Sequence, residues 1–275
     1  MEIAEIIFWI SWILLAYHLV GYWMILFLFN SLFRKKKAPF LKEEFYPSIT
    51  VICPAYNEEK AMEAKIQSFL NLDYPQDKIK MIVISDDSTD RTNEIVQKYT
   101  NQNISLIIQK PRAGKPNALN LVLPLLDSDY VLSTDADCLF EPQCVKMLVA
   151  NMLSDEKIGL VSGNVKKVQK GKLESGEGFY WKYEAFLKLM ESRFNTIIGA
   201  SGVIYLIKRE LFTAIELNSP DDFERVLITI KYGKIATFEP QANVLMEFTE
   251  RATEEIARKV RIITREWYVL QRNIE

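Results

Sequence analysis

Short apolar runs alternate with helical patterns along the chain from Ser48 to Leu139. The four apolar runs are S-I-T-V-I-C from Ser48, I-K-M-I-V-I-S from Ile79, I-S-L-I-I from Ile104 and D-Y-V-L-S-T from Asp129. Strands and helices in strict alternation indicate parallel strands joined by crossover helices. The chain is therefore expected to have an α/β fold, with a Rossmann-like, mainly parallel sheet flanked by helices.

Polar residues follow the ends of the expected strands. Tyr56 follows the first strand, Asp86 and Asp87 the second, and Asp135 and Asp137 the fourth. In open α/β sheets, ligands bind outside the carboxyl ends of the strands. We expect these side chains to converge at one edge of the sheet, which becomes the candidate site.

The acidic segment D-A-D contains Asp135 and Asp137, separated by one residue. If this segment stays extended, both carboxylates project from the same face. Carboxylate oxygens suit Mg²⁺ or Mn²⁺, and Mg²⁺ completes its shell with water and substrate phosphates. The pair predicts a divalent cation site for a diphosphate-bearing substrate. The alternative is that D-A-D only closes a strand, because Asp is common in turns.

A basic loop, K-P-R-A-G-K-P-N from Lys110, precedes the third helical pattern. Arg112, Lys115 and the free N–H groups at a helix start can bind phosphate, and Pro116 suits the first turn of that helix. A solvated basic loop is the alternative interpretation.

The adjacent carboxylates of Asp221 and Asp222 begin a later helical run. Such a pair commonly caps a helix and complements its dipole. Near a metal and a diphosphate, the same pair could supply a base. His18 is the only histidine and lies in the apolar N-terminal segment. Base chemistry in the rest of the chain is therefore expected to use a carboxylate.

Two further segments leave their roles open. Ile197 to Gly202 forms a glycine-bearing turn, which allows close approach of a ligand or is only a tight bend. Thr253 to Leu270 has the pattern of an amphipathic helix on which Arg261 and Arg265 fall four residues apart.

Composition excludes several classes of protein. The formal net charge of -2 and the pI near 5.8 argue against nucleic-acid binding, which usually needs a strongly basic domain. The chain has three cysteines without C-x-x-C spacing. Neither a disulfide framework nor a zinc site is therefore indicated.

Ile6 to Phe29 carries no formal charge and meets the ~20 residues needed to cross a bilayer. The start of the chain lacks the basic region of a signal peptide, so this helix is expected to be retained. The basic run Arg34 to Lys37 places the following residues on the cytoplasmic side. We expect a single-pass membrane protein, with residues 1–37 as the anchor and its basic flank and 38–275 as one cytoplasmic catalytic domain.

Five motifs occur in an order and spacing that resemble family 2 glycosyltransferases of the inverting, GT-A-fold kind. They are C-P-A-Y-N-E-E from Cys53, D-D-S-T-D from Asp86, G-K-P-N-A-L-N from Gly114, D-A-D from Asp135, and the pair Asp221-Asp222. The resemblance covers nearly everything after the apolar segment. It implies transfer of one sugar from a nucleoside diphosphate sugar, expected to be a UDP-sugar, to an acceptor hydroxyl. The implied cofactor is Mn²⁺ or Mg²⁺, and the expected acceptor is lipid-linked or a saccharide.

The resemblance also implies residue roles. The donor-binding residues would be Pro54, Ala55, Tyr56, Glu58, Asp86, Asp87, Lys115, Asp135, Arg261 and Arg265. Within this set Tyr56 would lie against the nucleotide base, and Asp87 would accept a hydrogen bond from that base. Lys115 would face the diphosphate. Asp135 and Asp137 would bind the ribose or sugar and the metal.

On the acceptor side, Asp222 would be the catalytic base. Asp221 would orient it or cap the helix. Gly202 would belong to the acceptor site. Arg261 and Arg265 would steady the diphosphate or an acidic acceptor.

The chain departs from polymer-making family members near Arg261. Those members carry Q-x-x-R-W, whereas Arg258 to Ile262 keeps the arginine and lacks the glutamine and the tryptophan. One membrane helix also cannot line a polysaccharide channel, so single transfer is expected. The alternatives are a processive polysaccharide synthase subunit, a nucleotidyltransferase and a non-enzymatic nucleotide-sugar-binding scaffold. Nucleotidyltransferases usually begin with a glycine-rich loop, which is not found at Pro54 to Glu58.

Overall fold

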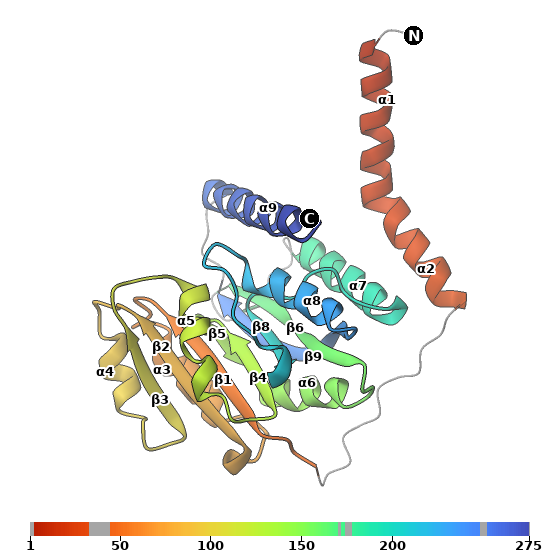
Figure 1. Cartoon of the computed structure of the whole chain (residues 1–275). Coiled ribbons are helices and arrows are strands. Elements are labelled where there is room, and N and C mark those ends of the chain that lie inside the picture. Colours follow the sequence, from red (N-terminus) through yellow and green to blue (C-terminus); the bar gives the residue numbers. More distant parts are fainter. Residues whose placement is uncertain (1–2, 33–44, 170–171, 174–177, 248–251, 275) are drawn as a thin grey trace.

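The computed structural model describes residues 3–32, 45–169, 172–173, 178–247 and 252–274. Its helices are α1 (Ile3–Ala16), α2 (Tyr22–Leu32), α3 (Met62–Leu70), α4 (Thr92–Gln97), α5 (Lys115–Leu121), α6 (Cys144–Met152), α7 (Gly178–Phe194), α8 (Asp221–Lys231) and α9 (Ala252–Ile274). Its strands are β1 (Ile49–Ala55), β2 (Ile79–Asp86), β3 (Ile104–Gln109), β4 (Tyr130–Thr134), β5 (Cys138–Phe140), β6 (Ile158–Gln169), β7 (Lys172–Leu173), β8 (Ile204–Lys208) and β9 (Ile235–Glu247). Figure 1 shows an α/β domain with α1 and α2 rising from one side.

Within the described residues, nine strands form one sheet in the order β3-β2-β1-β4-β8-β6-β9-β5, with β7 paired to β6. β1 pairs in parallel with β2 and β4, and β2 pairs in parallel with β3, as the alternation predicts. β8 runs antiparallel to β4 and β6, whereas β9 runs parallel to β6 and antiparallel to β5. The α/β class is confirmed, and the strands beyond β4 make the sheet mixed.

Successive side chains of the parallel strands enter two separate cores. Val51 and Cys53 of β1 pack under α3 and α6, whereas Ile52 between them packs in the core that includes α5 and α8. All three side chains are fully buried. Strands covered on both faces read as continuous apolar runs. This explains why the parallel strands are evident in the sequence.

Helix α3 begins at Met62, because Asp90 and Thr92 satisfy backbone N–H groups that precede it. The Glu58 N–H donates to Thr92 Oγ1 at 2.8 Å. The Glu59 N–H donates to Asp90 Oδ2 at 3.0 Å. The segment after β1 is therefore a loop, which places Glu58 beside the carboxyl end of the strand.

The sequence patterns did not predict β9. Its apolar run is interrupted by Glu239, Pro240 and Gln241, where the pairing of β6 with β9 shifts register between Ser162 and Asn164. A proline is tolerated in a strand at such an irregularity because it removes one ladder donor. The break hides a 13-residue strand from a search for periodic apolar residues.

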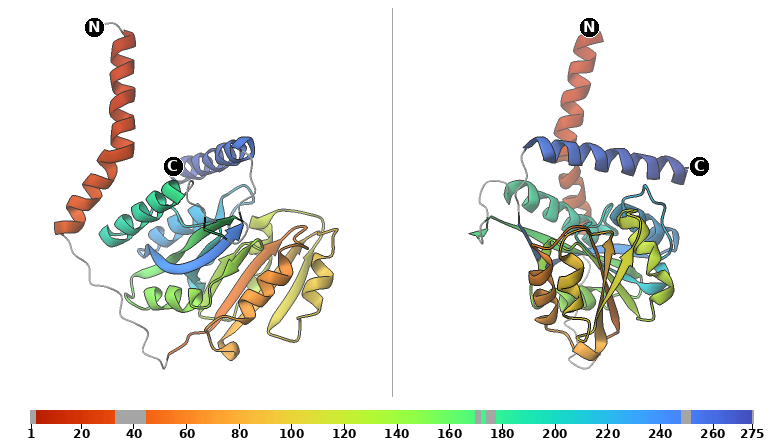
Figure 2. Two further views of the ribbon diagram at one scale, coloured as in Figure 1. Left: turned by 180° about the vertical axis from the view of Figure 1, so that it is seen from behind. Right: turned by 90° about the vertical axis from the view of Figure 1, so that its left-hand side faces the viewer.

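The N-terminal apolar segment is one helix, in which a π-helical stretch, η1 (Tyr17–Gly21), joins α1 to α2. Ile3–Ser31 is long and apolar enough to cross a membrane. Most of its side chains are exposed, and Figure 2 shows the helix projecting from the domain. The basic run Arg34 to Lys37 lies outside the described residues, so the expected cytoplasmic flank stays a prediction.

The packing around Gly159 of β6 yields a prediction about stability. A Cβ there would lie 2.5 Å from Leu211 Cδ1 and 2.9 Å from Thr229 Cγ2. We expect Gly159→Ala to lower the free energy of unfolding by ~1–3 kcal/mol, the usual cost of overpacking. The control Gly199→Ala meets nothing within 4 Å. Urea unfolding of both variants in detergent measures the difference, and equal stabilities would contradict this packing.

Candidate active site

The D-A-D segment is a turn. β4 ends at Thr134 and β5 begins at Cys138, so Asp135 to Asp137 connect two strands. The expectation that an extended backbone aligns the two carboxylates is wrong, because β5 leaves β4 to pair with β9. The carboxylates are nevertheless close. Partial desolvation and the Asp135 charge raise the pKa of Asp137, although this residue is exposed at the surface.

Glu58 joins this turn from the loop after β1. Burial, together with the charges of Asp137 and Asp135, raises the pKa of Glu58 to about 7. We call Glu58, Asp135 and Asp137 the acidic cluster. Carboxylates that share a site repel one another, and a bound cation or a proton relieves that repulsion.

The acidic cluster has the donor chemistry of a Mg²⁺ or Mn²⁺ site, because all of its ligands are hard carboxylate oxygens. Within the residues that the structure describes, no group of three or more His, Cys, Asp or Glu side chains is arranged to bind a metal by itself. A cation at the acidic cluster would therefore take its remaining ligands from water and from substrate phosphates, as Mg²⁺ commonly does.

Lys115, the first residue of α5, connects three segments of the site. Its Nζ lies 2.8 Å from Asp135 Oδ1 and 3.4 Å from Asp221 Oδ1. The same ammonium donates to the Gly202 carbonyl at 2.8 Å. Burial lowers the pKa of Lys115, but Asp135 and Asp221 outweigh this effect and hold it well above its usual range. Lys115 is therefore a permanent cation among acidic residues.

Asp86 fastens the basic loop to the sheet edge. Its two carboxylate oxygens accept from the Ala113 and Gly114 N–H groups, each at 2.8 Å. Gly114 has a φ of 86°, which favours glycine, and immediately precedes α5. Asp86 is buried, whereas the adjacent Asp87 is partly exposed with a φ of 61°. Asp86 thus positions Lys115, and Asp87 remains open to a ligand.

The end of β1 presents an aromatic ring to the site. The Arg112 guanidinium lies 3.6 Å from the ring centroid of Tyr56, which is exposed. Pro54 and Ala55 precede Tyr56 within β1, and Ala55 is buried. The ring and the guanidinium form a stacked pair at the sheet edge, where a flat base can pack.

The adjacent residues Asp221 and Asp222 have different environments at the start of α8. Asp221 is buried, accepts from the Tyr205 hydroxyl at 3.0 Å and pairs with Lys115. Asp222 is half-buried, and burial and the Asp221 charge raise its pKa to about 7. Pro220 occupies the N-cap position, and Asp222 Oδ1 accepts from the Phe223 N–H in the first turn of α8, at 3.0 Å. The helix-capping interpretation therefore applies to Asp222, which satisfies one N–H group of the first turn, while Asp221 bonds to Tyr205 and Lys115 instead.

Gly202 lies directly against Asp222. A Cβ at Gly202 would lie 3.0 Å from Asp222 Oδ2 and 3.5 Å from its Cγ. The turn before β8 therefore approaches the Asp222 carboxylate more closely than a residue with a side chain would allow. The close approach is to a side chain of the protein, and the expected approach of a ligand to this turn stays a prediction.

Helix α9 brings a carboxylate toward Asp222 and leaves the expected arginines exposed. The Glu266 charge adds to burial and to Asp221 in raising the pKa of Asp222. Arg261 and Arg265 are exposed on the same helix. Arg272 connects α9 to α8, with Nη2 2.5 Å from Glu224 Oε1. Sequence patterns missed Glu266 because its approach to Asp222 depends on how α9 packs.

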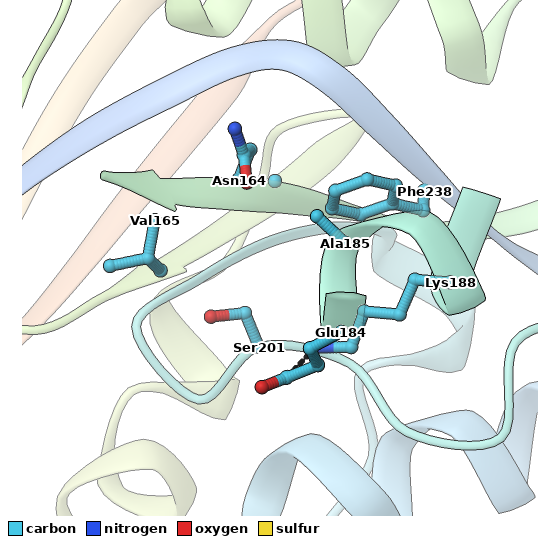
Figure 3. Close-up of a pocket in the computed structure, with 8 residues that line it drawn as sticks. Asn164, Val165, Glu184, Ala185, Lys188, Ser201 and Phe238 are labelled. Carbon is cyan, nitrogen blue, oxygen red and sulfur yellow. Dashed lines mark hydrogen bonds and ion pairs between the residues drawn. The ribbon is translucent and has the colours of Figure 1, made fainter. Parts of the chain in front are cut away.

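Two cavities of the domain lie away from the acidic cluster. Figure 3 shows a cavity of about 20 Å³ lined by Gly163, Asn164, Val165, Glu184, Ala185, Lys188, Ser201 and Phe238. It has room for about one water molecule. A second cavity, of about 270 Å³, lies at the amino-terminal ends of β1 and β2, opposite the candidate site.

Comparisons of the sequence with known proteins identify its relatives. The sequence model of Glycosyl transferase family 2 matches residues 50–215. The probable glycosyltransferase YdaM of Bacillus subtilis (strain 168) is 32% identical over 173 residues, which are 58% of this chain and 40% of that protein. The poly-β-1,6-N-acetyl-D-glucosamine synthase of Staphylococcus aureus (strain COL) is 29% identical over 178 residues, 63% of this chain and 42% of the synthase. The matched segment is thus about two fifths of these relatives' length.

A solved structure shares the fold. The mannosyltransferase PcManGT of Pyrobaculum calidifontis, in complex with GDP-Man and Mn²⁺, superposes with a TM-score of 0.78 at 23% identity. The superposition covers 96% of this chain and 75% of the mannosyltransferase.

This α/β sheet, with an acidic turn at its strand edge, has the GT-A fold. The family model covers more than half of the 275 residues, so the chain belongs to Glycosyl transferase family 2. The fold class, the enzyme class and the family expected from the motifs are confirmed.

Proposed function

We propose that this chain transfers a single sugar from a nucleoside diphosphate sugar, a UDP-sugar, to an acceptor hydroxyl with inversion. The observation that carries the proposal is the contrast between two adjacent carboxylates. Asp221 is ion-paired with Lys115, whereas the pKa of Asp222 is raised to about 7. A carboxylate with a pKa near the working pH is suited to general-base catalysis.

The donor lies along the sheet edge in this proposal. Tyr56 and Arg112 pack against the base above Pro54 and Ala55, and Asp87 accepts from the base. Asp86 acts indirectly, because its carboxylate fixes the loop before Lys115.

The diphosphate lies at the acidic cluster. Asp135 and Asp137 would be the metal ligands, with water and the substrate phosphates supplying the other oxygen donors. A bound Mn²⁺ or Mg²⁺ would neutralise the charge of the leaving diphosphate. Lys115 places a second positive charge beside Asp135. The exposed Arg261 and Arg265 are assigned to the diphosphate or to an acidic acceptor.

The acceptor hydroxyl lies beside the Asp222 carboxylate, next to the turn that contains Gly202. Its oxygen attacks the anomeric carbon, its proton passes to the Asp222 carboxylate, and the bond from the anomeric carbon to the diphosphate breaks. Asp221 stays in its bonds to Lys115 and Tyr205 and orients the neighbouring base. One displacement of this kind inverts the anomeric centre.

The membrane helix favours an acceptor at the bilayer. Residues 1–37 are the anchor, 38–275 form the cytoplasmic catalytic domain, and the acceptor is lipid-linked or a saccharide precursor. No nucleic acid is involved, in keeping with the pI near 5.8.

Processive polysaccharide synthesis is the second candidate. The Staphylococcus aureus relative is a poly-β-1,6-N-acetyl-D-glucosamine synthase, which favours it. The incomplete Q-x-x-R-W pattern around Arg261 favours a single transfer. Family membership supports sugar transfer over nucleotidyl transfer and over a binding scaffold.

The length of the product tests the proposal. The full chain in detergent is incubated with Mn²⁺, with UDP-GlcNAc or GDP-mannose as donor, and with a polyprenol-linked saccharide or a free N-acetylglucosamine oligosaccharide as acceptor. We expect mass spectrometry to show an acceptor longer by one sugar, with UDP-GlcNAc preferred. A ladder of product lengths supports the processive alternative. A preference for GDP-mannose overturns the choice of uracil as the nucleotide base of the donor.

The acidic cluster predicts that UDP binding requires a divalent cation. We expect calorimetry to show that Mn²⁺ tightens UDP binding to the unmodified chain and that Asp137→Ala removes this effect, because one metal ligand is lost. Asp127→Ala is the matched control, since that aspartate is exposed and pairs with Lys80 at the opposite edge of the sheet. Equal UDP affinities in Mn²⁺ and in EDTA for the unmodified chain would contradict the cation site.

The raised pKa of Asp222 predicts a pH dependence. The transfer rate should rise as the pH passes through about 7, because the base acts only after losing its proton. Asp222→Asn should lower turnover by ~10²–10⁴-fold while leaving donor affinity nearly unchanged. Single-turnover rates across pH, with donor affinity by calorimetry, are measured for Asp222→Asn and for Asp221→Asn. Near-normal transfer by Asp222→Asn would move the role of base to Asp221.

A further inference from the structure

The membrane helix is hydrogen-bonded to the catalytic domain. α2 packs against α7, as Figure 1 shows. The Tyr22 hydroxyl donates to Glu191 Oε1 at 2.6 Å. Near the other end of α2, Asn30 Nδ2 donates to the Met190 carbonyl at 2.9 Å. Polar side chains are costly in a membrane segment unless they have partners. These bonds therefore fix the position of the helix against α7 rather than leave it a loose tether.

Glu191 bonds two different segments with its two oxygens. Oε1 accepts from Tyr22, and Oε2 accepts from the Ile198 backbone N–H at 3.3 Å. The side chain is buried and lies in the last turn of α7, where the helix dipole disfavours a negative charge. A buried carboxylate at this end of a helix is costly, so its two hydrogen bonds must offset that cost.

The segment that Glu191 contacts leads directly into the candidate site. Ile198 begins the turn that ends at Gly202, whose carbonyl accepts from Lys115. One residue further, the Val203 carbonyl accepts from the Asp135 N–H at 3.1 Å. Gly202 also lies against Asp222. Ile197 to Val203, which we call the acceptor turn, is thus bonded to α7 at one end and to the site at the other.

We propose that Glu191 is a positioning residue that couples the docked membrane helix to the acceptor turn. Tyr22 fixes the orientation of the Glu191 carboxylate, and the carboxylate fixes Ile198 and, through the turn, the place of Gly202 beside Asp222. The helix is then part of the catalytic geometry as well as an anchor. The expected change in acceptor kinetics rests on the proposed function. The expected change in the stability of the acceptor turn rests on the hydrogen bonds alone.

The test removes one hydroxyl from the full chain in phosphatidylcholine nanodiscs. Tyr22→Phe deletes the bond to Glu191, and Tyr17→Phe is the matched control, because that tyrosine of the same helix is half-exposed. Hydrogen exchange of residues 195–203 is followed by mass spectrometry. We expect severalfold faster exchange in Tyr22→Phe and no change in Tyr17→Phe. Equal exchange in both variants overturns the coupling without any reference to activity.

Kinetics give the second readout. With UDP-GlcNAc and the oligosaccharide acceptor, Tyr22→Phe should lower kcat/KM for the acceptor by about tenfold, the usual weight of a hydrogen bond to a charged group. The KM for the donor should stay within about twofold. Donor and acceptor KM rising together, or unchanged acceptor kinetics, overturns the positioning role. Failure of the unmodified chain to transfer sugar rejects the proposed function and leaves the exchange experiment to decide the coupling.

A double variant separates coupling from general loss of structure. Glu191→Gln replaces one carboxylate oxygen by an NH2 group, which cannot accept a hydrogen bond. Tyr22 and Ile198 then no longer have one acceptor oxygen each. If Tyr22 acts only through Glu191, Tyr22→Phe should lower acceptor kcat/KM no further in the Glu191→Gln background. Independent, additive losses overturn the inference. If Glu191→Gln does not fold, the comparison of Tyr22→Phe with Tyr17→Phe still decides it.

Discussion

The site depends on one desolvated ammonium. Moving a lysine away from water is costly unless its partners replace the lost hydration. Lys115 has two carboxylates and a backbone carbonyl as partners, supplied by the D-A-D turn, the start of α8 and the turn before β8. These segments lie far apart in the sequence. Because each of them satisfies the same cation, the position of one constrains the other two.

The parallel half of the fold could be predicted because its strands are buried on both faces and read as unbroken apolar runs. The same alternation of strands and helices predicted which polar residues lie at the carboxyl ends of the parallel strands. β9 could not be found in this way, since Pro240 interrupts its pattern at a register shift. The backbone at Asp135 was predicted as extended, whereas the pairing of β5 with β9 makes it a turn.

Local sequence identified the candidate carboxylates but not their electrostatic surroundings. Asp221 and Asp222 are neighbours in the chain, yet only one of them reaches Lys115. The approach of Glu266 to Asp222 depends on how α9 crosses the domain, and no short motif encodes such packing. The position of Glu58 depends on a bond between distant segments, from its N–H to Thr92 Oγ1 at the start of α4. The motifs thus indicate which residues meet, and tertiary packing determines the charge each one experiences.

The π-helical stretch Tyr17–Gly21 changes the direction in which the side chains of the N-terminal helix point around its axis. A π turn contains one residue more than an α turn, so side chains beyond it are displaced around the axis by about 100° relative to an unbroken α-helix. The Tyr183 hydroxyl donates to the His18 and Leu19 carbonyls of this stretch, at 3.3 and 3.0 Å. The extra residue therefore rotates the side chains of α2 around the helix axis relative to those of α1. It lets α2 direct Tyr22 toward α7 while the orientation of the side chains of α1 around the helix axis is set independently.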